Sequence, residues 1–179
     1  MRLQNIFSFQ EQPPKVAYLD PCFCINILIE GAKFHTECFE YAEKLEVEKT
    51  ILLLSNLGLD EIWFALLRIN AIEVLKNKGI VEADRKWFWF LKDNPQIVME
   101  LTKSIEENTL LLLEIPKLIL VEITEQQTLH ALILMKEFGL MPRDAIHGAS
   151  AKLSGAGAII TTDKDFNRIK EINIYTCNT

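Results

Sequence analysis

Four acidic residues have types and neighbours that could support chemistry. Asp20 and Asp163 each follow a run typical of a buried strand, and Asp144 comes two residues after the Pro142 that would open a helix. Glu61 is predicted to lie on a helix among apolar or small neighbours, where burying an unpaired carboxylate would be costly. If such groups met, each pair about 5 Å apart would repel by roughly 3 kcal/mol at an effective dielectric near 20. A hard divalent cation such as Mg²⁺ or Mn²⁺ removes that repulsion, and oxygen ligands select it.

Each acid also has a purely structural interpretation. Asp20 precedes a proline, and an Asp-Pro pair is a common helix N-cap followed by proline at the first helical position. Asp163 could cap a short helix, and Asp144 could be favoured by the dipole of the helix it helps to open. Glu61 could pair with Arg68, two helical turns further on. For each acid considered alone, the sequence does not decide between its structural interpretation and a role in metal binding.

The elements that would position the acids follow from hydrophobic patterning. Short apolar and β-branched runs predict four strands, over residues 15–20, 51–54, 117–123 and 156–162, and residues 173–177 could add a fifth. Amphipathic or proline-opened segments predict helices over residues 21–31, 35–49, 57–79, 83–108, 124–139 and 142–153, the third of them capped by Ser55 or Asn56. The segment 83–108 is expected to break near Asn94-Pro95 into two helices, and the helix over 57–79 is apolar almost all round, so it should be largely buried.

Strands that alternate with helices predict an α/β fold in a single domain over residues 1–179. We expect a mostly parallel sheet of four to five strands with helices on both faces, and extra helices between strands two and three. Within these, residues 84–115 look like a helical insertion. Ligands of such sheets bind beyond the carboxyl ends of the strands, which is where Asp20 and Asp163 are predicted to lie.

Composition narrows the class of protein further. Hydrophobic residues make up 49% of the 179, which is enough for a full core. A net charge of −6 argues against broad coating of nucleic acid, although acids that hold a metal would inflate that count. The four cysteines form no paired CxxC frame, so we expect buried, reduced thiols rather than zinc. No segment resembles a membrane span or a signal peptide, and we expect a cytoplasmic protein.

Four stretches, AYLDPCFCINILI, SNLGLDEI, PRDAIHGASA and AIITTDKDF, resemble the PIN domain nucleases in this order and over nearly the whole chain. In that family a glutamate lies six residues after a serine or threonine that follows the second strand. That spacing from Ser55 selects Glu61 over Asp60. The resemblance implies an endonuclease, most often acting on RNA, that depends on one or two Mg²⁺ or Mn²⁺ ions. Many bacterial and archaeal members are VapC-like toxins, each paired with an antitoxin protein.

The resemblance also implies roles for particular residues. The metal ligands would be Asp20, Glu61, Asp144 and Asp163, and Asp165 could be a fifth, outer ligand or could cap a turn. Thr162 could orient Asp163 through its hydroxyl, and Cys22 stands where the family usually has serine, threonine or asparagine. The basic residues nearest the last two acids are candidates for contacting substrate phosphate; they are Arg143, Lys164 and Arg168. His147 could touch the substrate, but a structural role explains it better.

Two other functions compete with a nuclease. A PIN-like domain that no longer cuts could serve as an RNA-binding or protein-interaction module, and Cys22 and the acidic charge favour that alternative. A phosphoacceptor or phosphatase domain would want two acids near the end of the first strand, where the stretch LDPCFC offers one. The region between Glu61 and Asp144 is longer than in compact toxins, which weakens the toxin assignment more than the fold.

Consecutive aromatic residues in the stretch KWFWFL, over residues 86–91, cannot all face one side of a helix. We expect some of them to fill a core and others to lie at a protein interface, because large exposed apolar patches usually mark contacts. The predicted partner at that surface is a second copy of the chain, forming a homodimer, or another protein.

Overall fold

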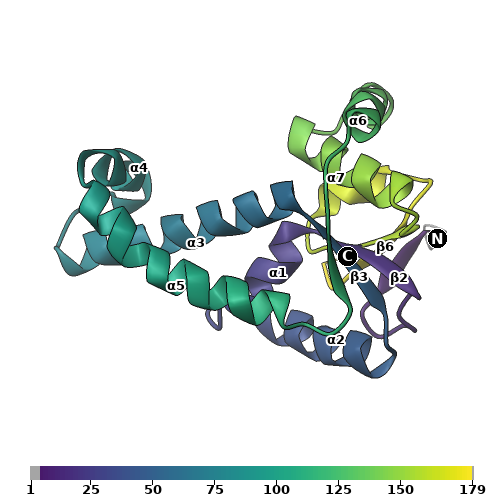
Figure 1. The fold of residues 1–179 in the computed structure, drawn as a ribbon, viewed down its shortest axis with the longest axis horizontal. Coiled ribbons are helices and arrows are strands. Elements are labelled where there is room, and N and C mark those ends of the chain that lie inside the picture. The colour runs from purple at the N-terminus through teal and green to yellow at the C-terminus, as the bar shows by residue number, and fades with distance from the viewer. Residues whose placement is uncertain (1–4, 179) are drawn as a thin grey trace. The chain divides into compact units, whose positions relative to one another are not determined.

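Short runs of apolar residues distributed along the chain form one parallel sheet in the computed structural model, which describes residues 5–178 (Figure 1). Within those residues the sheet has six strands: β1 (Ile6–Ser8), β2 (Val16–Leu19), β3 (Ile51–Ser55), β4 (Leu118–Val121), β5 (Ala158–Ile160) and β6 (Asn173–Thr176). Their order is β1-β6-β5-β2-β3-β4, and every neighbouring pair is parallel. The predicted α/β fold and parallel sheet are confirmed, with six strands instead of four to five.

The additional strand is β1, which pairs with β6 at one edge of the sheet. It has only three residues, all half-buried, and Phe7 stacks on Tyr175 of β6 with ring centroids 4.9 Å apart. Three residues are too few for alternation or composition to distinguish a strand from a loop. Its pairing partner lies more than 160 residues away along the chain, so only the folded sheet shows it.

Helices cover both faces of this sheet, as predicted. The helices α6 (Glu125–Phe138) and α7 (Pro142–Leu153) pack on one face, while α1 (Pro21–Leu28) and α2 (His35–Val47) lie on the other (Figure 1). Side chains alternate accordingly: Tyr18 and Ile159 belong to the core beneath α7, whereas Tyr175 stacks on Tyr41 of α2. Covering helices explain why the strands are apolar on both faces.

Two helix ends illustrate how the predicted bounds compare with the structure. Thr124 and Gln127 form a capping box that begins α6, which is followed by Gly139 in the left-handed conformation (φ 64°), as the predicted bounds of 124–139 require. The helix α1 ends at Leu28, before the predicted stop at Gly31, because Ile29 is already extended.

All four cysteines have free thiols that form no disulfide bond.

A second compact unit, Asp60–Glu114, is distinct from the first, which comprises the chain up to Leu59 together with Ile115 onward. The second unit holds most of α3 (Asn56–Asn77), with α4 (Ala83–Asp93) and α5 (Pro95–Leu113). The break at Asn94-Pro95 is confirmed, although the second helix continues to Leu113 instead of 108. Residues 84–114 lie in this unit, which begins at Asp60, and the helical insertion over 84–115 stays a prediction.

The core of the second unit explains its aromatic residues. Trp87 and Leu91 are buried with Ala71 and Leu75, whereas Trp89 is 68% exposed. The prediction that the KWFWFL stretch supplies both core and surface is therefore confirmed, and its role as an interface stays a prediction. The prediction that α3 is largely buried is wrong, since other side chains of this unit cover only part of it and leave Trp63 43% exposed.

Among the described helices, none combines the length and the apolar character that crossing a membrane requires.

Candidate active site at the carboxyl ends of β2 and β5

Sheet register brings the first and fourth predicted acids together. The strands β2 and β5 are neighbours, with Leu19 opposite Ile160, and the backbone N–H of Asp20 donates to the carbonyl of Ile160 at 3.1 Å. The residues after β5, Thr161 to Asp163, therefore lie beside Asp20 at the same edge of the sheet. This edge is where parallel α/β sheets bind ligands.

Asp20 does not use its carboxylate to cap α1. Asp20 is the N-cap residue of α1 and is followed by proline in the first turn, as the structural interpretation predicts, but within residues 5–178 its side chain forms no capping hydrogen bond. Instead its Oδ2 accepts hydrogen bonds from Thr161 Oγ1, at 2.7 Å, and from the Cys22 thiol. Burial raises the pKa of Asp20 above its usual value, against the opposing effects of His147 and of these two hydrogen bonds. A buried carboxylate held this way by side chains is poised to interact with something other than its own helix.

Cys22 takes the place of a hydroxyl beside Asp20. Its thiol donates to Asp20, while its sulfur accepts from the backbone N–H and the hydroxyl of Thr162, at 3.2 and 3.1 Å. Burial raises the pKa of Cys22 well above its usual value, so the sulfur stays protonated and can remain a donor. At the position where the resemblance leads us to expect serine, threonine or asparagine, a thiol thus makes a hydrogen bond to Asp20.

Thr161 is a site residue that the sequence reasoning missed. Its hydroxyl donates to Asp20 Oδ2 and accepts from the backbone N–H of Asp163 at 2.8 Å, so it joins two of the acids. The sequence instead suggested that Thr162 orients Asp163, but the Thr162 hydroxyl donates to Cys22. The Thr-Thr pair was a visible signal, but the sequence did not show which hydroxyl faces Asp20.

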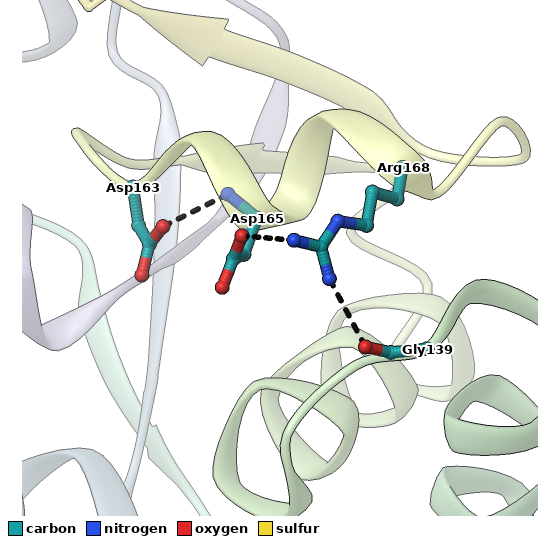
Figure 2. A network of polar contacts seen from close by, with 4 residues as sticks. All are labelled: Gly139, Asp163, Asp165 and Arg168. Atoms are coloured by element: carbon teal, nitrogen blue, oxygen red, sulfur yellow. Dashed lines mark hydrogen bonds and ion pairs between the residues drawn. The ribbon is translucent and has the colours of Figure 1, made fainter.

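Asp163 and Asp165 lie at the start of the short 3₁₀ helix η1 (Lys164–Arg168), as Figure 2 shows. Asp163 Oδ1 accepts from the backbone N–H of Asp165 at 2.8 Å, which confirms a capping role for that oxygen. Asp165 Oδ1 pairs with Arg168 Nη2 at 2.6 Å, and Arg168 Nη1 donates to the carbonyl of Gly139 at 3.0 Å. Arg168 therefore ties η1 to the end of α6, and its contact with a substrate phosphate stays a prediction.

Asp144 is the third residue of α7 and is half-buried. Its pKa is raised to about 6, first by burial and then by the negative charges of Asp163, Asp20 and Asp165, while His147 opposes the increase. Carboxylates from three separate elements, the ends of β2 and β5 and the start of α7, are thus close enough to repel one another. Three of the four predicted ligands and Asp165 therefore influence one another electrostatically, and their roles as metal ligands stay predictions.

The acidic side chains near this edge of the sheet offer oxygen donors of the kind that a hard divalent cation prefers. In the part of the chain that the structure describes, no three His, Cys, Asp or Glu side chains are already placed around a common metal position. Mg²⁺ usually keeps several waters and binds through one or two carboxylates, so close packing of all the ligands is not required. Oxygen donors that repel one another when ionised are the chemistry such an ion stabilises.

The remaining predicted residues have different surroundings. Glu61 lies on α3 in the second unit, six residues after Ser55, and its role as a ligand stays a prediction. Arg143 and Lys164 are exposed, and their contacts with substrate also stay predictions. His147 is only 1% exposed and bonds to the Tyr18 hydroxyl at 2.7 Å, as its structural interpretation requires.

The fold and these acids define an α/β domain with carboxylates gathered at the ends of neighbouring parallel strands. The chain belongs to the PIN domain family, because the model of that family matches residues 17–172. No protein in a curated collection matches the chain.

Two solved structures resemble the fold. Mycobacterium tuberculosis VapC20, described as a sarcin-ricin loop cleaving toxin, is 15% identical with a TM-score of 0.54, over 85% of this chain and 92% of that one. VapBC2 from Rickettsia felis, bound to a DNA fragment from its promoter, is 13% identical with a TM-score of 0.56, over 89% and 96% of the two chains. At these identities the likeness shows the fold alone.

Proposed function

We propose that this protein is a Mg²⁺- or Mn²⁺-dependent endoribonuclease of the PIN type. The observation that carries the proposal is the position of Asp20 and Asp163 beside each other at the carboxyl ends of β2 and β5, in a chain that the PIN domain model matches over residues 17–172. The pKa of Asp144, raised to about 6 first by burial and then by Asp163, Asp20 and Asp165, agrees with it. Neighbouring carboxylates repel one another when they are ionised. A cation that binds among them removes this repulsion and so explains why they lie together. Asp20, Glu61, Asp144 and Asp163 would hold one or two ions, with Asp165 as an outer ligand.

Several residues of the protein would have distinct roles at this site. Thr161 and the Cys22 thiol orient the Asp20 carboxylate through hydrogen bonds, leaving its other oxygen, Oδ1, outside these bonds. Asp163 likewise uses Oδ1 to cap η1. When bound, the cation supplies an activated water and neutralises charge on the phosphate oxygens. Arg143, Lys164 and Arg168 are the cations we propose for holding the substrate phosphate.

The proposed substrate is RNA and the proposed biological role is that of a toxin in a toxin–antitoxin pair. Support comes from the two fold relatives, one described as a sarcin-ricin loop cleaving toxin and the other solved as VapBC2 bound to a promoter DNA fragment. We accordingly propose a cytoplasmic protein with an antitoxin partner, and a homodimer formed through exposed aromatic residues such as Trp89.

Metal binding and cleavage by Asp144→Asn test the nuclease. Asp84→Asn is a matched control, because Asp84 also lies in the first turn of a helix, α4, but in the second unit. We expect Mn²⁺ to raise the melting temperature of wild type and Asp84→Asn but not of Asp144→Asn. RNA cleavage should be nearly abolished only in Asp144→Asn, with circular dichroism unchanged. Equal cleavage by purified Asp144→Asn would contradict the proposal.

The alternative, an inactive RNA-binding or interaction module, predicts a different result. Such a protein would bind RNA in a gel-shift assay without cleaving it, and Mn²⁺ would leave its melting temperature unchanged. The toxin role has its own test, in which induced expression should arrest growth of a bacterial host and Asp144→Asn should not. Co-expression of a small protein encoded beside the gene should restore growth, and failure to do so would count against the antitoxin.

A further inference from the structure

A chain of buried hydrogen bonds joins three elements of the first unit beside the candidate site. The Tyr18 hydroxyl lies 2.6 Å from Ser55 Oγ and 2.7 Å from His147 Nδ1. Ser55 Oγ also accepts a 3.0 Å hydrogen bond from the backbone N–H of Gly58, in the first turn of α3. None of the three side chains is more than 1% exposed. The chain therefore runs from the start of α3 through β2 to α7 without meeting solvent.

Each member of this chain lies close in sequence to a proposed ligand. Tyr18 is two residues before Asp20 on the same strand end, and His147 is one turn after Asp144 on α7. Ser55 ends β3 and caps α3, the helix on which Glu61 lies. The hydrogen bonds thus link the elements that carry the acids.

Stability alone does not explain three polar groups at this position. Burying a hydroxyl or imidazole forfeits its hydrogen bonds to water, and replacing both partners of a buried pair by apolar groups of the same shape can be nearly neutral. Phenylalanine and leucine would fill the space of Tyr18 and His147. Hydrogen bonds differ from such apolar contacts because they fix both distance and direction, and satisfied buried networks specify a unique arrangement.

Close packing beside His147 on α7 and at the start of α3 restricts the movement of these two helical segments. A Cβ added to Gly148, next to His147, would lie 2.8 Å from Ile169 Cδ1 and 3.1 Å from Leu134 Cδ1. A Cβ added to Gly58 would lie 2.7 Å from Leu54 Cδ1. At both glycines the end of a neighbouring side chain would have to shift to make room for a Cβ.

We propose that Tyr18 and His147 are positioning residues for divalent-cation binding, which fix α7 and its Asp144 against the end of β2 that carries Asp20. The inference rests on the proposed function, because it concerns the same cation site. It goes beyond that function by assigning the geometry of the site to two side chains that would never touch the ion or the RNA.

The test compares two pairs of variants by Mn²⁺ affinity, measured from the electron paramagnetic resonance signal of free Mn²⁺ at a temperature where circular dichroism shows every variant folded. Tyr18→Phe removes the bridging hydroxyl. Tyr41→Phe is its matched control, because Tyr41 is also buried but its hydroxyl finds no hydrogen-bond partner among the described residues. His147→Leu removes Nδ1, whereas His147→Asn keeps a polar atom at nearly the same position.

We expect Tyr18→Phe and His147→Leu to weaken Mn²⁺ binding about 10-fold, the lower end of the range for residues that orient metal ligands. Tyr41→Phe and His147→Asn should bind like wild type. If Tyr18→Phe is less stable but binds Mn²⁺ as wild type does, the chain is only a structural network and the inference is wrong. If Tyr18→Phe does not fold, the two His147 variants decide by the same criterion. Absence of Mn²⁺ binding by wild type would overturn the proposed function itself, and this inference with it.

Discussion

The Thr161 hydroxyl donates to Asp20 Oδ2 across 2.7 Å, from the end of β5 to the end of the neighbouring strand β2. The same hydroxyl accepts from the backbone N–H of Asp163. One side chain therefore sets the separation of two acids that lie more than 140 residues apart in the sequence. Thr161 is fully buried, so water cannot replace it easily.

Thr161→Val should consequently weaken both the fold and the site. Valine has the same shape but no hydroxyl, so Asp20 loses a buried donor at a cost of about 1–3 kcal/mol in the free energy of unfolding. Thr161→Ser keeps the hydroxyl and should retain Mn²⁺ binding. Urea denaturation and Mn²⁺ titration of the two variants check this, and a Thr161→Val protein as stable as Thr161→Ser would contradict it.

Cys22 allows a test of whether a donor is needed beside Asp20 or only a side chain of that size. Cys22→Ser supplies a hydroxyl donor, and we expect it to bind Mn²⁺ about as well as wild type. Cys22→Ala removes the donor that faces Asp20 and the acceptor that faces Thr162, and should weaken Mn²⁺ binding about 10-fold. Calorimetric titration with Mn²⁺ measures both, and equal affinities for the two variants would show that the thiol's hydrogen bond is dispensable.

The position of Asp20 and Asp163 could be predicted because both follow strands whose apolar runs are visible in the sequence. The choice of Thr161 over Thr162 could not, because adjacent residues face opposite sides of a strand end and their roles depend on the register of β5 against β2. That register results from packing of the whole sheet, including the three-residue β1 that the sequence did not reveal.

The hydrogen bond between Tyr18 and His147 could not be predicted from the sequence for a related reason. Tyr18 looked like an ordinary strand residue, and His147 like one polar residue on a helix of small side chains. Their hydroxyl and ring nitrogen meet only because α7 packs closely on β2, which depends on residues such as Gly148 rather than on either partner. Long-range pairs of this kind leave no spacing in a single sequence.

Gly148 gives a direct test of that close packing. Gly148→Val would press against Ile169 and Leu134, both buried, and overpacking of this kind costs about 1–3 kcal/mol. Gly31→Val is the control, because nothing lies within 4 Å of its added Cβ, and it should change stability by no more than about 0.5 kcal/mol. If thermal unfolding shows equal stability for the two variants, α7 is not held by this contact.

The raised pKa of Asp144 predicts how the metal-free protein responds to pH. Its value of about 6 in the folded state exceeds the usual 3.8, so the folded protein binds the proton more tightly than the unfolded chain does. The contribution is fully present below about pH 4 and is lost as pH rises through 6. Asp144→Asn stays neutral throughout this range and should therefore match wild type near pH 4 but exceed it in melting temperature at pH 7, with chelator present. Added Mn²⁺ at pH 7 should reverse the order by stabilising only wild type. If the melting temperatures of the two proteins without metal change with pH in parallel, the pKa of Asp144 is not raised in the folded protein.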